Sequence, residues 1–307
     1  MKLWQARLGL LGVALLWALG YIATNQAIQY LSVTQMQIVR FAITIFLLCL
    51  VFHKRLKKIT KKTVILGTLL GLVFFVGMTV HSVALETTTV SKNAFLVVFN
   101  IVFVPIIMYF LFKIKLKPYF VLGIITMIIG FFILVFNIDV FNLANSLAFL
   151  KTQAYLVLGD YLTLIASFVF AVQIVMIGYF VTKDDPINLV IIQLICAGLF
   201  SFIYCLIFQE AIPFINLKFE VWHLALPSVL YLGIAGCFAF VGQIIIQKYV
   251  PASNVALIFS TESLFATIFS VLLGLEPFSM GLLIGGIIIT IGIIWAETGL
   301  KFGNNKY

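Results

Sequence analysis

The chain is a succession of apolar runs separated by short polar breaks. The runs are continuous and about twenty residues long, which is the length that an α-helix needs to cross the hydrocarbon core of a bilayer. A membrane β-barrel would instead show segments of about ten residues in which apolar and polar positions alternate. Because lipid offers the backbone no hydrogen-bond partners, a helix bundle is the remaining way to span it. The pattern therefore predicts an all-α integral membrane protein.

Ten such runs can be delimited, and one longer polar stretch divides them into two groups of five. The predicted spans cover residues 8–27, 34–52, 64–83, 92–112, 118–137, 157–180, 187–208, 223–246, 251–273 and 279–297. Most connections are short. The exception, 139–156, we interpret as an extracytoplasmic linker between a first half, 1–138, and a second half, 157–298. The two halves together are expected to form one membrane domain.

Composition excludes a soluble protein, and the basic residues set the orientation. The chain is 64% hydrophobic and 9% charged, whereas soluble domains carry about 25% charged residues.

Placing the N-terminus inside puts fifteen of the 19 Lys and Arg residues on the inner side and only Lys92, Lys151 and Lys218 on the outer side. This bias predicts that both termini are cytoplasmic. The net charge of +9 then needs no nucleic-acid partner. The densest basic run, Lys54 to Lys62, anchors the topology and can also contact anionic membrane lipids.

Motifs for metal binding and catalysis are missing from the sequence. The cysteines lie inside apolar runs without C-x-x-C or zinc-type spacing, so we expect free thiols, no metal site and no cofactor. The three histidines stand in separate regions without the spacing of a catalytic set, and no nucleotide-binding motif is present. The first apolar run lacks a cleavage site and is interpreted as a retained helix. These observations disfavour an enzyme.

A shift of 162 residues aligns several positions of the two halves. The aligned pairs are Gly71 and Gly233, Ser91 and Ser253, Ala94 and Ala256, Phe103 and Phe265, Gly123 and Gly285, and Gly130 and Gly292. Repeats of five spans each must lie in opposite orientations, because five is odd. Inverted repeats are the mechanical basis of alternating access around a site near the midplane of the membrane. The sequence therefore favours a transporter with two inverted five-helix repeats.

Three stretches of the sequence resemble one known family. The first is Leu15 to Gly20, followed by Val39–Arg40–Phe41. The second begins at Ala84–Leu85 and includes Ser91, Ala94 and Pro105. The third begins at Tyr231–Leu232–Gly233 and includes Gln247–Lys248, Ser253, Ala256, Glu262 to Ala266, Gly274–Leu275–Glu276, Gly285 and Gly292–Ile293. On these residues the chain resembles the drug/metabolite transporter superfamily, and within it the EamA-type ten-helix transporters. The family usually has proline where Ser263 stands, and Gly-Glu where Leu275 separates Gly274 from Glu276.

The resemblance implies a secondary transporter in the plasma membrane that exports small organic solutes, such as amino acids, other metabolites or drugs. A membrane channel is the alternative, although rings of like charge or carbonyl filters are not visible in the sequence. An integral membrane enzyme is the less favoured alternative. Short loops and the absence of an N-x-S/T sequon fit a bacterial membrane.

Polar residues at membrane depth are the candidate solute-binding or coupling residues, because each is costly to insert. Glu262 lies midway along the ninth span, and the shift of 162 residues aligns it with Asn100 in the fourth. Asn93 precedes Asn100 by seven residues and would share its helical face. Glu262 is hypothesised to contact an amino group of the solute or to take up a coupled proton, since burial favours the uncharged carboxyl group. A purely structural role, bonding neighbouring helices, stays open.

His81 and Gln243 form a second aligned pair, expected near opposite ends of the membrane. A histidine titrates near neutral pH, so His81 is either a proton site or a hydrogen-bonded interfacial residue. Gln243 either lines the pathway or bonds across helices.

The first span carries Trp17, Tyr21 and Thr24 within one arc. An arc of aromatic rings and hydroxyl groups suits a planar or amphipathic solute, although such side chains also pack between helices. Arg40, in the second span, is interpreted as reaching the interface or pairing with a carboxylate of an outer loop.

Overall fold

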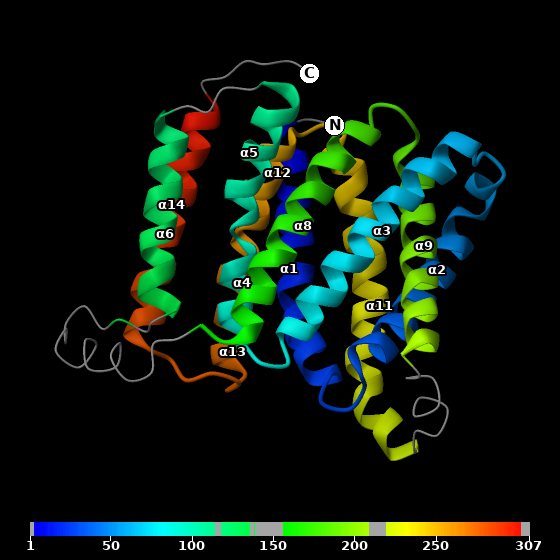
Figure 1. Ribbon diagram of the computed structural model, residues 1–307, viewed down its shortest axis with the longest axis horizontal. Coiled ribbons are helices and arrows are strands. Elements are labelled where there is room, and N and C mark those ends of the chain that lie inside the picture. The colour runs from blue at the N-terminus through cyan, green and yellow to red at the C-terminus, as the bar shows by residue number, and fades with distance from the viewer. Residues whose placement is uncertain (1–2, 114–117, 136–137, 139–155, 209–218, 302–307) are drawn as a thin grey trace.

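The computed structural model describes residues 3–113, 118–135, 138, 156–208 and 219–301. Within these ranges all regular secondary structure is helical (Figure 1). The helices are α1 (Leu3–Ala27), α2 (Val33–Leu56), α3 (Lys61–Ala84), α4 (Val90–Val97), α5 (Asn100–Phe112), α6 (Pro118–Val135), α8 (Leu158–Phe180), α9 (Pro186–Ile207), α11 (Phe219–Gln247), α12 (Ala252–Phe259), α13 (Thr261–Leu272) and α14 (Met280–Lys301).

Among the described residues, eight helical segments are long and apolar enough to cross a membrane, when α4 with α5 and α12 with α13 each count as one. α6 and α14 contribute shorter apolar stretches, Pro118–Leu134 and Met280–Ala296. Large apolar side chains also cover the outside of the bundle, as at Phe46, Phe110 and Phe238, which are 66%, 67% and 67% exposed. Water would disfavour such a surface, whereas lipid would not. The chain is therefore a multi-pass membrane protein. The count of ten spans in two inverted repeats stays a prediction, and the predicted linker, 139–156, lies almost wholly outside the described residues.

Polar side chains fix the starts of three helices by bonding backbone N–H groups that have no partner within the helix. Ser32 and Gln35 form a reciprocal pair of bonds at the start of α2, and Thr60 and Thr63 do the same at the start of α3. Asp185 accepts from two backbone N–H groups at the start of α9. These residues stand in the polar breaks between the apolar runs, so each break also sets the start of the next helix.

Two predicted spans are interrupted near their middle. The sequence predicted continuous helices over 92–112 and 251–273, but the first breaks at Val98 and Phe99 and the second at Ser260. At the second break the hydroxyl groups of Ser260 and Thr261 donate to the carbonyl oxygens three residues earlier, at 2.6 and 2.7 Å. Such local bonds compete with the helical pattern. Each break places a polar residue in the first turn that follows it, Asn100 in α5 and Glu262 in α13.

α6 and α14 lie side by side at one edge of the bundle, and α1 lies in its middle (Figure 1). The contact between α6 and α14 is made by backbone. A Cβ atom on Gly123 would meet the backbone nitrogen of Ala296 at 2.5 Å, and one on Gly130 would meet the carbonyl oxygen of Gly285 at 2.8 Å. Small residues allow this close approach of two membrane helices.

Candidate functional site

A cavity lies at the centre of the bundle, where both interrupted helices break. The free space in and around it is about 780 Å³, including the part that opens to the surroundings. Side chains from α1, α2, α3, α4, α5, α8, α11, α12 and α13 line it. The lining is mostly apolar, with aromatic rings from Trp17, Phe170, Phe240 and Phe259. Trp17 packs edge-on against Phe240 at 5.1 Å and stacks on Phe259 at 6.3 Å.

Seven of the eight candidate residues named from the sequence line this cavity. They are Trp17, Tyr21, Thr24, His81, Asn100, Gln243 and Glu262. The structure thus brings His81 and Gln243 to the same cavity, where the sequence suggested opposite ends of the membrane. The eighth residue, Asn93, is fully buried but does not line the cavity. The roles of these residues in binding or coupling stay predictions.

Several polar groups in the cavity wall have no hydrogen-bond partner within the described part of the chain. They are Trp17 Nε1, Arg40 Nε, both ring nitrogens of His81, Asn100 Oδ1 and Gln173 Nε2. A buried donor or acceptor left unpaired costs about 1–3 kcal/mol, so native interiors contain few of them. Their concentration in one cavity indicates a place where a polar ligand or water completes the bonding.

Glu262 and Tyr21 meet in the cavity wall. Glu262 is 7% exposed, and the Tyr21 hydroxyl group is the neutral donor beside its carboxyl group. No Lys, Arg or His nitrogen of the described residues lies within 4.0 Å of that carboxylate. Tyr21 also packs edge-on against the His81 ring, with ring centroids 4.9 Å apart. The carboxylate therefore has one neutral hydrogen-bond donor and a face that is open to the cavity.

Arg40 does not occupy the interfacial position that was expected for it. It is 5% exposed and lines the cavity, and its guanidinium carbon lies 5.4 Å from the centroid of the Phe41 ring. Within the described ranges no carboxylate oxygen lies within 4.0 Å of its side chain. Two carboxylates of the predicted outer loops, Glu86 and Glu276, are described and form no ion pair with Arg40, whereas the side chains of three others are not described: Asp139, Glu210 and Glu220. Arg40 therefore belongs to the cavity wall.

The sequence analysis missed Gln173 and Tyr231 as lining residues. Gln173 is 3% exposed and faces the cavity from α8. Tyr231 faces it from α11, and its hydroxyl group donates to the carbonyl oxygen of Leu16 at 2.8 Å. Gln173 is a polar residue in the middle of a predicted span, so the criterion that selected Glu262 applies to it equally.

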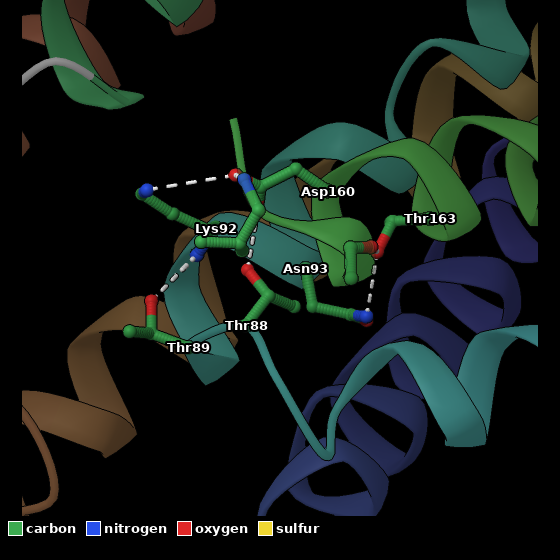
Figure 2. Close-up of polar contacts among 8 residues, drawn as sticks. Thr88, Thr89, Lys92, Asn93, Asp160 and Thr163 are labelled. Atoms are coloured by element: carbon green, nitrogen blue, oxygen red, sulfur yellow. Dashed lines mark hydrogen bonds and ion pairs between the residues drawn. The ribbon is translucent and has the colours of Figure 1, made fainter. Parts of the chain in front are cut away.

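Figure 2 shows how α4 and the residues just before it are attached to the first turns of α8. Asp160 is fully buried, and its carboxylate accepts a hydrogen bond from the Thr88 hydroxyl group at 2.5 Å. The ammonium group of Lys92 lies 3.6 Å from the same carboxylate. One turn further along, the side-chain amide of Asn93 donates to the Thr163 hydroxyl group at 2.9 Å. Asn93 thus holds two helices together rather than facing the cavity.

A second group of polar contacts lies beyond the other end of α8. Arg55 forms an ion pair with Asp185 at 3.0 Å, and the Thr63 hydroxyl group donates to Asp184 at 2.7 Å. These contacts join the end of α2 and the start of α3 to the connection between α8 and α9. Both ends of α8 are therefore tied to the first half of the chain, with the cavity between them.

The described residues contain no group of three or more His, Cys, Asp or Glu side chains that could hold a metal ion. The four cysteines, Cys49, Cys196, Cys205 and Cys237, are free.

Comparison with known proteins gives matches of three kinds: to a family profile, to a curated relative and to a solved structure. The profile of the EamA-like transporter family matches residues 4–136 and again residues 157–298. An "Uncharacterized transporter" of Archaeoglobus fulgidus is 28% identical over 293 residues, which cover 94% of this chain and 84% of the relative. A solved structure described only as "Crystal structure of protein" is similar with a TM-score of 0.69, over 97% of this chain and 98% of that chain. At 16% identity, this last similarity shows the fold alone.

Proposed function

Because the chain belongs to the EamA-like transporter family, we propose that it is a secondary transporter that exports a small organic solute by alternating access. The solute is an amino acid, another metabolite or a drug-like compound. One observation carries the proposal: a central cavity, formed where two helices are interrupted, is lined by buried polar groups that lack partners. Transporters typically bind their solutes near the midplane at such discontinuous helices.

The two ends of α8 suggest how access would alternate. Polar contacts attach one end through Asp160 and the other through Asp184 and Asp185. Opening the cavity to one side requires the contacts on that side to separate while the other set stays closed. In this scheme Glu262 binds an amino group of the solute or takes up a coupled proton, since its carboxylate faces the cavity with a single neutral donor beside it.

The placement in the cell is part of the same proposal. Both termini lie in the cytoplasm of a bacterial cell, and the residues 1–138 and 157–298 form two inverted five-helix repeats in the plasma membrane. The excess of basic residues on one side of the predicted spans supports this orientation. Asp160 then lies near the outer end of the bundle, and Asp184 and Asp185 lie near the inner end.

The first test compares metabolites in cells that express the protein, a Glu262→Ala variant, or a Glu86→Ala control at matched membrane levels. Glu86 is exposed and does not line the cavity. We expect one solute class to leave cells with the native protein and the control but not with Glu262→Ala. Counterflow in liposomes then checks the hit, because a carrier shows saturable exchange whereas a channel does not.

Each other outcome has a definite meaning. Equal flux through all three proteins would keep the carrier and remove Glu262 from the binding site. Flux that never saturates would favour the channel. If no solute in a broad panel moves with any of the proteins, the proposed function is wrong.

A further inference from the structure

Arg40 is the one cationic side chain that lines the central cavity, within the part of the chain that the structure describes. A guanidinium group carries its charge permanently and offers five N–H donors in one plane. Arg40 lies in the second turn of α2 and is only 5% exposed, and a charged side chain is costly to bury within a membrane helix. Proteins usually offset that cost with a carboxylate, and the described residues provide none within 4.0 Å of Arg40.

The surroundings of Arg40 leave its donors available to the cavity. Its Nε atom is buried without a hydrogen-bond partner, and its nearest aromatic neighbour, Phe41, offers only a ring at 5.4 Å. Neither ring nitrogen of the neighbouring His81 has a partner of its own. The fold therefore keeps a desolvated positive charge at the cavity wall and does not neutralise it.

Glu262 lines the same cavity from α13 and forms no ion pair with Arg40. When Glu262 is ionised, it and Arg40 give the cavity a negative and a positive pole that do not contact each other. A solute that lacks an anionic group would leave the positive pole uncompensated on binding, and an unpaired buried charge is strongly unfavourable. The planar guanidinium group matches the two oxygens of a carboxylate, or those of a phosphate, in a bidentate arrangement.

We propose that Arg40 is an oxyanion-binding subsite of the cavity, so that the transported solute carries a carboxylate or another oxyanion group. The proposal rests on the transporter function proposed above and specifies the chemistry of its solute. When an amino group is also present, Glu262 is placed to receive it. The solute would then be held by its two charged ends.

The test measures binding to the purified full-length protein with four solutes that share one carbon skeleton. They are leucine, 4-methylpentanoate, leucinamide and 4-methylpentanamide, which carry both charges, the negative charge, the positive charge and no charge. Sets of four solutes with the same pattern of charges are also prepared for other carbon skeletons, including that of the solute identified in cells. We expect each member with a carboxylate to bind at least tenfold more tightly than its amide. Arg40→Gln should abolish that difference, and Arg40→Lys should retain part of it.

The unfolding temperature of the protein without solute distinguishes a binding role of Arg40 from a structural one. A charge kept unpaired for a ligand destabilises the empty protein, so Arg40→Gln should unfold at the same temperature as the native protein or a higher one. Asp139→Asn, Glu210→Gln and Glu220→Gln serve as controls, because an ion pair of Arg40 with any of these carboxylates would make that variant behave like Arg40→Gln.

Three results would overturn the subsite. The amides could bind as tightly as the acids, or Arg40→Gln could bind the acids as the native protein does. Arg40→Gln could also lower the unfolding temperature and weaken all four solutes equally, which would make Arg40 structural. In each of these cases solute exchange by the native protein would leave the carrier intact. Absence of binding and exchange for every solute would refute the carrier and the subsite together.

Discussion

Replacing Asp160 should lower the free energy of unfolding, by an amount that depends on which of its contacts each variant removes. The fully buried carboxylate accepts hydrogen bonds from the Thr88 hydroxyl group at 2.5 Å and from the Val157 backbone N–H at 3.1 Å. Asp160→Ala leaves both donors unpaired, at about 1–3 kcal/mol each. Because Thr88 and Val157 are partly accessible and can rehydrate, we expect a total loss of about 2–4 kcal/mol. Asp160→Asn keeps one acceptor oxygen and replaces the other by an NH2 group, so one of the two donors loses its partner and the expected cost is about 1–3 kcal/mol.

Lys92→Met removes the ion pair with Asp160 and keeps the two hydrogen bonds of the carboxylate. The Lys92 ammonium group lies 3.6 Å from the carboxylate, and its side chain is 27% exposed. Partly exposed pairs contribute about 0–1 kcal/mol, so this variant should be the mildest of the three. Unfolding in detergent micelles, monitored by tryptophan fluorescence, measures the loss of stability of each of the three variants and so ranks them. If Lys92→Met costs as much as Asp160→Ala, or Asp160→Asn costs nothing, the assignment of stability to the two hydrogen bonds is wrong.

Two further predictions concern helix packing and the second polar cluster. Gly123→Ala would place a Cβ atom 2.5 Å from the backbone nitrogen of Ala296 and should destabilise by about 1–3 kcal/mol. Gly12→Ala, with nothing within 4 Å, should be neutral or stabilise by up to about 1 kcal/mol, and equal unfolding temperatures for the two variants would contradict this. Arg55→Gln removes an ion pair with Asp185 whose side chains are 44% and 36% exposed. It should cost less than about 1 kcal/mol at low salt and nothing measurable in 1 M salt, and a loss that persists at high salt would refute this.

The positions of the apolar helices and many of the polar residues that line the cavity were predictable from the sequence for one physical reason. Lipid makes a buried polar group expensive, so apolar runs mark the spans, and the few polar residues inside them point inward. Glu262, Asn100 and Gln243 were found in this way, and all three line the cavity. Gln173 satisfies the same criterion and was passed over.

The remaining features depend on contacts that the sequence does not reveal. The break in the fourth predicted span falls at Val98 and Phe99, where neither proline nor glycine marks it. The break at Ser260 had a weak signal, since serine and threonine can bond their own backbone. Because α4 ends before Asn100, the seven-residue spacing from Asn93 did not place both amides on one continuous face. The position of Arg40 could not be predicted, because a basic residue in the outer part of a span usually reaches the interface.

The close fit of α6 and α14 has a consequence for how the protein is made. α6 ends at Val135 and α14 begins at Met280. A ribosome that adds about 5–20 residues per second needs roughly 7–30 s to cover that interval. During this time the glycine-lined face of α6 is already synthesised, while the helix that fills it does not yet exist. The edge of the bundle is therefore completed last, and a nascent chain released before α14 leaves α6 without the backbone partner that its glycines fit.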